Sequence, residues 1–509
     1  MIQIGCRLWN LSIVSVLILT FSNILLTVRL LHSTDCSRQE APPSEPLRLQ
    51  QQQFKDSRTP GQSHESSPTP PHCKVANSTT GPTATVTNGT VFRVDLRLGR
   101  WDSRHLYKLY DFALPGDRYA ELSEKYSVCL ATQSSLEKLQ SLVQVAHHWT
   151  GPISAAVFAA GDEYSLVQLY VAFLRRCYPV VRDRVSFHLA YPKDRPPSQI
   201  RPDFPSRPKL DCRRPEAALS GLVRLRKPET VKWRIKAAYP QNHLRNLARR
   251  NCQSSYVFLT DVDIIPSAKL TDGLDVFLKN AKCKSLCAYV IPTYELDERV
   301  LFPRNKTDLI RLARKGLARP FHHRVFIYNQ FATNFSRWQA TAGREGEAVH
   351  VNHNVTNFEF LYEPFYVAPD TVPAHDERFI GYGYTRNTQV YEMFVAGYQF
   401  QVLSPIFTCH WGLQNKKGRP SWRERQNSMN RRHFETFKSE VFARYRKDPL
   451  KMLGSKKTGQ KRERVIRLSH NLETGFMRLL VLKTQGTYLV LFRRSTHDVF
   501  PANSVVTTM

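Results

Sequence analysis

Acidic side chains are scarce in this sequence of 509 residues, which holds 43 Asp and Glu against 73 Lys and Arg. The resulting formal net charge of +30 excludes a predominantly acidic surface. It favours anionic partners such as nucleic acid, an anionic membrane, or phosphorylated or acidic sugars, without choosing among them. Hydrophobic residues make up 41% of the chain, which is enough for a large core and excludes disorder throughout.

Three common catalytic motifs are also absent. The chain contains no Gly-x-Gly-x-x-Gly, no Gly-x-x-x-x-Gly-Lys-Ser/Thr and no Gly-x-Ser-x-Gly segment. Their absence argues against dinucleotide-dependent redox chemistry, P-loop phosphoryl transfer and serine hydrolase chemistry. The sequence shows no internal repeat, and its length allows one large α/β unit with appendages.

The N-terminus contains one long apolar run. Residues 8–31 include about 20 mostly apolar residues before the first charge, Arg29, which is enough to cross a bilayer. A cleaved signal peptide is the alternative, but the run is longer than the apolar region of such peptides and no Ala-x-Ala-like site follows it. We therefore predict a cytoplasmic tail over residues 1–7 and a single-pass type II signal anchor over 8–31.

The segment after this run predicts a flexible stem over residues 32–90. It is rich in Gln, Pro, Ser and Thr, so it cannot bury enough apolar surface to offset the entropy of ordering it. Acceptor sequences for N-glycosylation begin at Asn77, Asn88, Asn305, Asn334 and Asn354. Together with the apolar run, these sequons indicate a lumenal body.

Cysteine usage fits an oxidising compartment. Nine of the ten cysteines follow the predicted anchor, and because nine is odd at least one is free or intermolecular. Cys283 and Cys287 have the spacing of half a zinc site, but no second Cys/His pair with zinc-finger spacing accompanies them. A disulfide or two packed thiols is the favoured interpretation of this pair.

From about residue 91 the sequence alternates strand-like and helix-like segments. The predicted strands span residues 153–160, 185–191, 256–260 and 398–407, and the predicted helices span 164–176, 242–250 and 386–396. Another helix is expected to open at Pro266-Ser267, and Gly397 stands where a C-terminal cap would. This alternation predicts an α/β fold with a mostly parallel sheet and helices on its faces.

The C-terminal extension over residues 451–509 differs from this body. Lys and Arg crowd between residues 456 and 467, and a strand-like stretch follows at 487–492. A solvated tail or a small appended hairpin is favoured over a specific binding role.

Asp261 and Asp263 follow the apolar strand 256–260. Parallel sheets place ligand sites outside the carboxyl ends of their strands, so both carboxylates are expected in a crevice. In extended backbone the two side chains point to the same side and suit a hard cation, Mn²⁺ or Mg²⁺, that also holds a diphosphate. A solvated turn is the alternative. His410, which follows the strand expected at 400–409, is the candidate third ligand, although a lone histidine is more often packed or exposed.

Five ordered segments resemble the β-1,4-glucuronyltransferase family, which includes the second catalytic domain of the bifunctional xylosyl/glucuronyltransferases that build matriglycan. They are residues 239–249, 261–267, 362–367, 376–383 and 410–412. The resemblance covers roughly residues 91–449, so we predict a GT-A glycosyltransferase catalytic domain over residues 91–450. The stem and the C-terminal extension have no counterpart in it.

The resemblance implies a Golgi membrane enzyme that transfers glucuronic acid from UDP-glucuronate to a xylose-terminated glycan in a β-1,4 linkage with inversion. In the family the acceptor is the O-mannosyl glycan of α-dystroglycan. Asp261, Asp263 and His410 match the family's metal ligands, with Mn²⁺ expected and Mg²⁺ as the alternative. Trp411 stands where a family member has a basic residue, so Lys416 or Lys417 is the candidate for phosphate contact.

Inverting transfer needs a carboxylate that takes the proton of the acceptor hydroxyl. Asp376 is the favoured candidate, followed by Glu377 and Glu392; a structural salt bridge or helix-face charge is the alternative for each. The donor carboxylate calls for a cation, and Arg245 and Arg386 are the candidates, with Asn246 and Lys416 as further donor contacts. Tyr362 and Trp338 could stack on acceptor sugars, but core positions are favoured for both.

Two other functions stay open at this stage. The first is a β-1,3-N-acetylglucosaminyltransferase using UDP-N-acetylglucosamine, an activity once assigned in this family. The second is a catalytically silent glycan-binding partner of another transferase. Expected partners are a UDP-sugar, a xylose-terminated glycan or glycoprotein, the Golgi membrane and other glycosyltransferases. Nucleic acid is not expected, because the anchor and sequons place the basic surface in the lumen.

Overall fold

A computed structural model describes residues 92, 94–197, 211–283, 285–341, 343–344, 346–415 and 420–453, and the backbone of 477–484 and 487–494. The predicted tail, signal anchor and stem lie outside the described residues, as do Asn77, Asn88, Lys416 and Lys417. No helix within the described part of the chain has the length and apolar character needed to span a bilayer.

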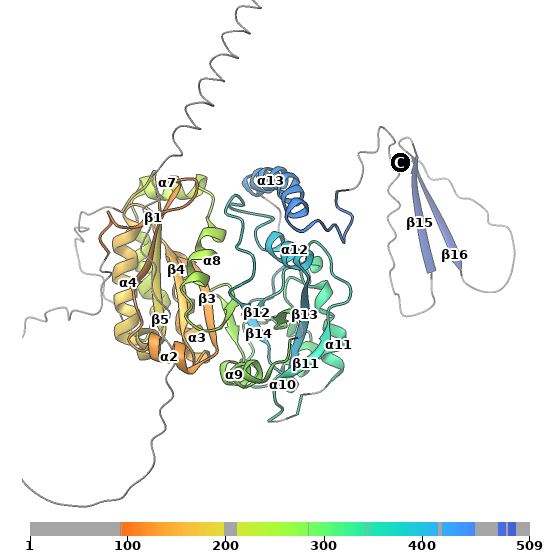
Figure 1. Cartoon of the computed structure of the whole chain (residues 1–509), viewed down its shortest axis with the longest axis horizontal. Coiled ribbons are helices and arrows are strands. Elements are labelled where there is room, and N and C mark those ends of the chain that lie inside the picture. Colours follow the sequence, from red (N-terminus) through yellow and green to blue (C-terminus); the bar gives the residue numbers. More distant parts are fainter. Residues whose placement is uncertain are drawn as a thin grey trace, which may run out of the picture. The chain divides into compact units, whose positions relative to one another are not determined.

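The first half of the body is built on six strands with helices around them (Figure 1). The strands are β1 (Arg100–Trp101), β2 (Tyr107–Leu114), β3 (Val128–Ser135), β4 (Ile153–Phe158), β5 (Val185–Pro192) and β6 (Tyr256–Leu259). The helices are α2 (Tyr119–Lys125), η1 (Leu136–Lys138), α3 (Ser141–His148), α4 (Glu163–Cys177), α5 (Pro179–Arg184), α6 (Pro215–Arg224), α7 (Pro228–Lys236), α8 (Gln241–Arg250) and α9 (Leu270–Asn280).

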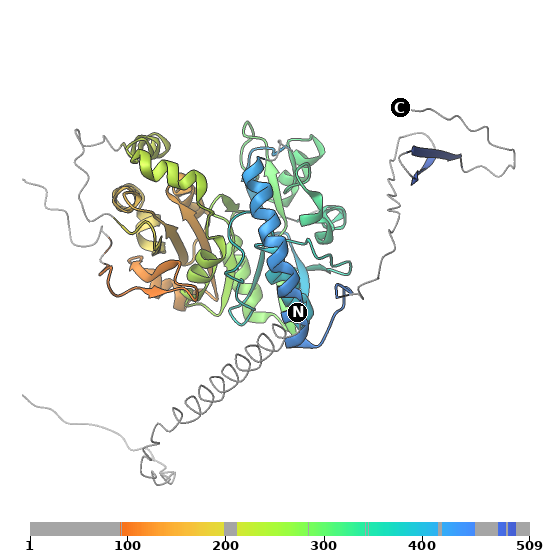
Figure 2. The ribbon, with the colours of Figure 1, turned by 90° about the horizontal axis from the view of Figure 1, so that it is seen from above.

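The second half has shorter strands, and the long helix α13 lies along it (Figure 2). Its strands are β7 (Ile264–Pro266), β8 (Leu286–Val290), β9 (Thr293–Leu296), β10 (Ala318–Pro320), β11 (His350–Asn354), β12 (Tyr366–Pro369), β13 (Tyr398–Ser404) and β14 (Thr408–Trp411). Its helices are α10 (Lys306–Arg314), η2 (Ile327–Asn329), η3 (Phe331–Thr333), α11 (Phe335–Ala340), α12 (Asn387–Ala396) and α13 (Ser421–Tyr445). In the C-terminal extension, β15 (Met477–Thr484) and β16 (Thr487–Arg494) form the antiparallel hairpin that the sequence allowed.

The main sheet has ten strands in the order β1-β2-β5-β4-β3-β6-β12-β8-β13-β11. Strands β5, β4, β3 and β6 are parallel neighbours, and β8 is parallel to β13, but the other pairs are antiparallel. The α/β class is thus confirmed, but the sheet is mixed and the prediction of a mostly parallel one is wrong outside the centre. The reason is β12, which runs antiparallel between β6 and β8; residues 355–365, which connect β11 to β12, contain no helix to provide the crossover that a parallel strand needs.

Helices cover both faces of the parallel block because successive strand residues point to opposite sides. Leu166, Tyr170 and Phe173 of α4 share one buried cluster with Ala155 and Val157 of β4. On the other face, Leu244, Leu247 and Ala248 of α8 share a different cluster with Ala156 and Phe158. The apolar spacing of each helix therefore sets which face of the sheet it covers.

Most of the predicted elements are confirmed within a few residues. The expected strands 153–160, 185–191 and 256–260 are β4, β5 and β6, and the expected helices 164–176, 242–250 and 386–396 are α4, α8 and α12. Gly397 ends α12 with a φ of +102°, which glycine adopts readily.

Two of the predicted element boundaries are wrong. The strand expected over 398–407 stops at Ser404, because Pro405 has no N–H for the strand ladder, and β14 begins separately at Thr408. The helix expected to open at Pro266-Ser267 begins at Leu270, because residues 264–266 form β7 instead.

The cysteine prediction is confirmed. Cys283 and Cys287 form a disulfide, as do Cys129 with Cys252 and Cys177 with Cys212. Cys409 is the free cysteine of the described region, and burial raises the pKa of its thiol well above the ordinary value. A buried, protonated thiol is a poor nucleophile, and Cys409 packs in a hydrophobic cluster.

We predict that Leu247→Ala will lower the free energy of unfolding by about 2–5 kcal/mol, because it empties a fully buried position between α8 and the sheet. Urea denaturation of the variant and the wild type measures the difference. Arg250→Ala, at an exposed position on the same helix, is the control and should change it by less than about 0.5 kcal/mol. Equal effects of the two substitutions would contradict the packing described for α8.

Candidate active site

The predicted metal ligands Asp261 and Asp263 lie just beyond the carboxyl end of β6, before the short strand β7. Val262 between them is buried, and the N–H of Ile264 donates to the carbonyl of Asp261 and closes the turn. The side chains of Asp261 and Asp263 are 32% and 29% exposed. The prediction of extended backbone at these residues is therefore wrong, because the hydrogen bond from Ile264 closes a turn. The turn holds two carboxylates at the sheet edge with access to solvent.

Pairing between β14 and β7 brings His410 to Asp263. His410 is the register partner of Ile264, the residue after Asp263, and its Nε2 lies 3.5 Å from Asp263 Oδ2. Lys138 Nζ lies 3.4 Å from the same oxygen. Burial raises the pKa of the Asp263 carboxyl, but His410 and Lys138 outweigh it and hold the pKa below its ordinary value. Asp263 is accordingly an anion at neutral pH, facing an imidazole.

Two arginines converge on Asp261. Oδ1 of Asp261 accepts hydrogen bonds from Arg386 at 2.9 Å and from Arg245 at 3.4 Å, and both guanidinium groups are almost fully buried. Arg386 also lies over the ring of Phe365, 4.4 Å from its centroid. Burial raises the pKa of the Asp261 carboxyl, but the two arginines hold it below the ordinary value. The sequence predicted Arg245 and Arg386 as donor contacts, and the structure brings them together at the metal-ligand turn.

The three predicted ligands are only partly assembled. Among the described residues, a different group of His, Asp and Glu side chains has ligand atoms that all lie within 4.8 Å of one another. It consists of Asp102, His243 and Glu377. Asp263 and His410 face each other, whereas Asp261 is engaged by its arginines. Two carboxylates and one imidazole at a solvent-accessible turn nevertheless fit an ion such as Mn²⁺ in chemistry.

Two polar residues at this site were missed by sequence reasoning. His322 stacks on Phe321, and burial lowers its pKa to about 4, with Asp261 and His410 among the charges that act on it. The backbone N–H of His322 donates to Oε1 of the buried Glu295. Oε2 of Glu295 accepts from the side chain of Arg319 and from the backbone N–H of Gln414. No motif marked them, because they reach the site only through the sheet, in which β10 pairs with β9 and β9 pairs with β14.

Glu363 is the third polar residue without a predicted role. Burial raises its pKa, while Arg386 and Arg245 act in the opposite direction, so the carboxyl lies within their field and that of Asp261. Its Oε2 accepts a hydrogen bond from Asn329 Nδ2 at 2.6 Å. Its position in the segment 362–367, which carries the family resemblance, was the signal that could have identified it.

Comparison with known proteins now adds to this geometry. A family model described as a glycosyl-transferase for dystroglycan matches residues 127–446. The chain belongs to this family. It is 33% identical to human beta-1,4-glucuronyltransferase 1 (Homo sapiens) over 325 residues, or 63% of this chain and 77% of that protein. The corresponding protein of Danio rerio is 28% identical over 359 residues, or 69% of this chain and 83% of its own length.

A more distant relative and one solved structure complete the comparison. Xylosyl- and glucuronyltransferase LARGE2 of Mus musculus is 26% identical over 341 residues, covering 65% of this chain and 41% of that protein. The structure of GalNAc-T7 with UDP, GalNAc and Mn²⁺ has a TM-score of 0.33 at 7% identity, covering 73% of this chain and 72% of that one, a likeness too low to establish a shared fold. The family membership makes this chain a glycosyltransferase.

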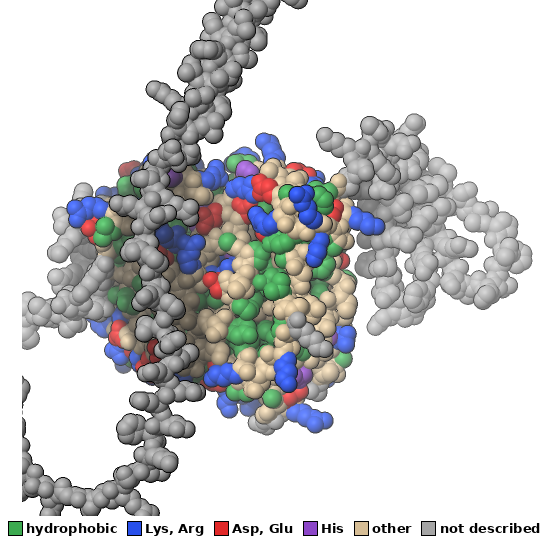
Figure 3. Space-filling view, in the orientation of Figure 1, with side chains coloured by type: hydrophobic (Ala, Val, Ile, Leu, Met, Phe, Trp, Pro, Cys, Tyr) green, Lys and Arg blue, Asp and Glu red, His purple; other side chains and the backbone are tan. Residues whose placement is uncertain are grey.

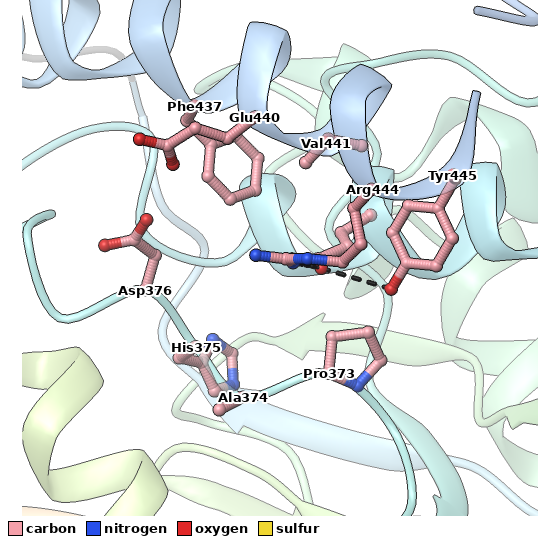
Figure 4. A pocket seen from close by; sticks show the side chains of 10 residues that line it. Pro373, Ala374, His375, Asp376, Phe437, Glu440, Val441, Arg444 and Tyr445 are labelled. Carbon is pink, nitrogen blue, oxygen red and sulfur yellow. Dashed lines mark hydrogen bonds and ion pairs between the residues drawn. The ribbon is translucent and has the colours of Figure 1, made fainter. Parts of the chain in front are cut away.

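The transferase holds two of its base candidates in a cavity of about 370 Å³ between α13 and the segment 373–376 (Figure 4). Asp376 is paired with Arg378 at 2.6 Å, and Glu392 is paired with Arg444 and accepts a hydrogen bond from Tyr445 at 3.2 Å. Burial raises the pKa of Glu392. Within the described chain each of these carboxylates is thus engaged by an arginine other than Arg245 and Arg386.

The side chains of Asn246 and Glu377 contact each other, His375 and His243. Asn246 accepts from the N–H of His375 and donates to its carbonyl and to Glu377 Oε1, so it holds the segment 375–377 on α8. Glu377 Oε2 faces His243 at 3.6 Å. The roles predicted for Asn246, Asp376, Glu377 and Glu392 stay predictions.

The two aromatic candidates for acceptor stacking belong to the core, the position that the sequence favoured. Tyr362 is fully buried and its hydroxyl is hydrogen-bonded to that of Thr333. Trp338 is fully buried, donates from Nε1 to the carbonyl of Leu403, and lies under Lys306. Neither ring faces solvent.

We predict that Asp261→Asn will lower the free energy of unfolding at pH 7 by about 1–3 kcal/mol, because Arg245 and Arg386 lose an ionised acceptor. The pKa of Asp261 is depressed in the folded chain, so its contribution is present above about pH 4, the ordinary carboxyl pKa, and is lost as the pH falls through the folded value. The variant should therefore lose less stability than the wild type on acidification below about pH 4.

Urea denaturation at a series of pH values measures both effects. Asp261→Glu keeps the charge and is the control, which should retain the acid-dependent loss. Identical pH profiles for wild type and Asp261→Asn would show that the arginines do not depend on this carboxylate.

Proposed function

We propose that this glycosyltransferase transfers glucuronic acid from UDP-glucuronate to a xylose-terminated glycan, forming a β-1,4 linkage with inversion. The observation that carries the proposal is the pair of buried guanidinium groups of Arg245 and Arg386 at the turn that bears Asp261 and Asp263. Two guanidiniums on one carboxylate oxygen leave surplus positive charge, which suits an acidic donor sugar and its diphosphate. The names of the relatives support the same donor.

We assign the body to the GT-A type, with the donor at the carboxyl end of the parallel strands. The four-strand parallel block, the helices on both its faces and the acidic turn after β6 support this assignment. Asp261, Asp263 and His410 would hold Mn²⁺, or Mg²⁺, which when bound neutralises negative charge on the departing nucleotide. Arg245 and Arg386 position the donor carboxylate, and Lys138 adds positive charge beside Asp263.

Two carboxyls compete for the role of base toward the acceptor hydroxyl. Asp376 was predicted from the sequence, but it is engaged by Arg378. Glu363 has a pKa raised by burial and interacts electrostatically with Arg386, Arg245 and Asp261, the residues of the proposed donor site. A raised pKa suits a group that must accept a proton near neutral pH. We therefore place Glu363 before Asp376 as the base.

The alternative functions have less support. N-acetylglucosamine carries no carboxylate, so a UDP-N-acetylglucosamine donor would leave the paired arginines without a sugar partner. A silent glycan-binding partner would not need the Asp263 and His410 pair. For nucleic acid, the basic side chains on the face shown in Figure 3 are spread out rather than gathered in one stripe.

We also propose a single-pass type II location in the Golgi membrane with the body in the lumen, where other glycosyltransferases of the same pathway would be partners. Three disulfides in the body support an oxidising compartment. The sequon residues Asn305, Asn334 and Asn354 are all exposed, so each amide is accessible to glycosylation.

We predict that the full-length protein with Mn²⁺ will transfer glucuronic acid to a β-xyloside in preference to N-acetylglucosamine, and that Asp263→Asn will lower this rate at least about 100-fold because it removes a metal ligand. Product mass spectrometry with a panel of UDP-sugars checks both points. Arg386→Lys should retain more of the activity than Arg386→Met, because only the first keeps the charge. Full activity of Asp263→Asn would overturn the proposal. Among base variants, Glu363→Gln should lose more kcat than Asp376→Asn.

We predict that treatment of the secretory-pathway protein with N-glycosidase F will increase its gel mobility, because exposed sequons in the lumen are modified. Single Asn305→Gln, Asn334→Gln and Asn354→Gln variants identify the sites used. A protein whose mobility is unchanged by the glycosidase would contradict the lumenal location.

A further inference from the structure

A second group of metal-ligating side chains lies outside the Asp261 turn. Asp102 follows β1, His243 is in the first turn of α8, and Glu377 is in the loop between β12 and α12. Their ligand atoms all lie within 4.8 Å of one another. Three segments far apart in the sequence therefore meet at one point.

The carboxylate of Asp102 is held by backbone groups alone. Its side chain is fully buried, Oδ1 accepts from the N–H groups of Leu106 and Tyr107 at 2.7 and 2.6 Å, and Oδ2 accepts from that of Arg104 at 3.0 Å. Oδ2 keeps a second lone pair and lies 3.5 Å from His243 Nε2. These bonds fix the carboxylate without neutralising it.

Glu377 is oriented in a similar way. Its Oε1 accepts from Asn246 Nδ2 at 3.0 Å, which leaves Oε2 turned toward His243 Nε2 at 3.6 Å. Asn246 is itself fixed by two hydrogen bonds to the backbone of His375. Metal-binding carboxylates often have one oxygen held by a hydrogen bond while the other binds the ion, and Glu377 has this arrangement.

His243 supplies the observation that points to an ion. Its side chain is fully buried, and neither ring nitrogen has a hydrogen-bond partner. The separations of 3.5 and 3.6 Å exceed the usual N–H···O range of about 2.7–3.2 Å. They are close to about 3.4 Å, the distance between two ligands of a tetrahedral Zn²⁺ whose bonds are about 2.0–2.2 Å long.

The charge of the group points the same way. Among the described residues, no Lys or Arg forms an ion pair with Asp102 or Glu377, although their two carboxylates meet at one buried histidine. Buried carboxylates without a cation are costly. A divalent ion would balance both and give His243 Nε2 the partner that it lacks.

We propose that Asp102, His243 and Glu377 bind one divalent cation of the Zn²⁺ type, separate from the metal of the sugar-transfer reaction. One imidazole and two carboxylates are ligands that Zn²⁺ accepts, and the 23% exposure of Glu377 lets water complete the shell. The ion fastens the segment after β1 and the loop 375–377 to α8. Its role is structural, and it stabilises the folded chain because the ligands come together only there.

The test uses the full-length protein stripped with a chelator and then incubated with Zn²⁺ alone. After gel filtration, zinc in the protein fraction is measured by plasma mass spectrometry, and thermal unfolding is recorded with and without Zn²⁺. Wild type and Asp263→Asn should each retain about one zinc per chain and unfold at a higher temperature with Zn²⁺. Glu377→Gln should bind Zn²⁺ at least about tenfold more weakly and lose the thermal shift.

Two further variants keep the outcome interpretable. His243→Gln should lose zinc, as is expected of Glu377→Gln. If His243→Gln fails to fold, Glu377→Gln still tests the site, because Glu377 is partly exposed. His353→Gln replaces a buried histidine outside the group and should keep the zinc of the wild type. Failure of the wild type to retain zinc or to shift, or unchanged binding by Glu377→Gln, would overturn the site. Asp263→Asn separates this result from the sugar transfer, because it should lower the rate of transfer at least about 100-fold and leave the zinc in place.

Discussion

The structure depends on the way buried charge is balanced around α8. Arg245 of this helix and Arg386, just before α12, share one oxygen of Asp261 and link the parallel half of the body to the second half. Guanidiniums this deeply buried are tolerated only when they are paired, so Asp261 is a structural anion as well as a proposed ligand. A donor or an ion that engages Asp261 must therefore change how the two arginines are satisfied, which couples ligand binding to the packing of both halves.

Sheet pairing determines which side chains of the second half lie near the turn that carries Asp261. β14 lies between β9 and β7, so His410 is set beside Asp263 by register rather than by proximity in the sequence. The same strand order makes Glu295 the register partner of His410, and the backbone N–H of His322 donates to Glu295. The centre thus combines a loop from the parallel block with a rigid small sheet, and the small sheet limits how far the imidazole can move.

Local pattern predicted the parts of the molecule that are local. The spacing of Leu244 and Leu247 predicted α8, and the apolar run before Asp261 predicted β6, but the turn that carries the carboxylates was expected as extended backbone. The direction of β12 and the break at Pro405 depend on contacts between distant segments, which no local periodicity contains. The same holds for the disulfide between Cys129 and Cys252 and for Glu363, whose raised pKa depends on burial by residues far along the chain.

Helix α8 carries polar side chains that point in different directions to different partners. Asn242 and Asn246 hold the loop 375–377, Arg245 faces Asp261, and Arg249 pairs with Asp370. Each residue of an α-helix turns the next by about 100°, so a single inserted or deleted residue would rotate every later side chain off its partner. Evolution can therefore alter this helix by substitution but hardly by a change of length. Insertions and deletions that change which substrates the enzyme accepts are expected in the connecting loops instead.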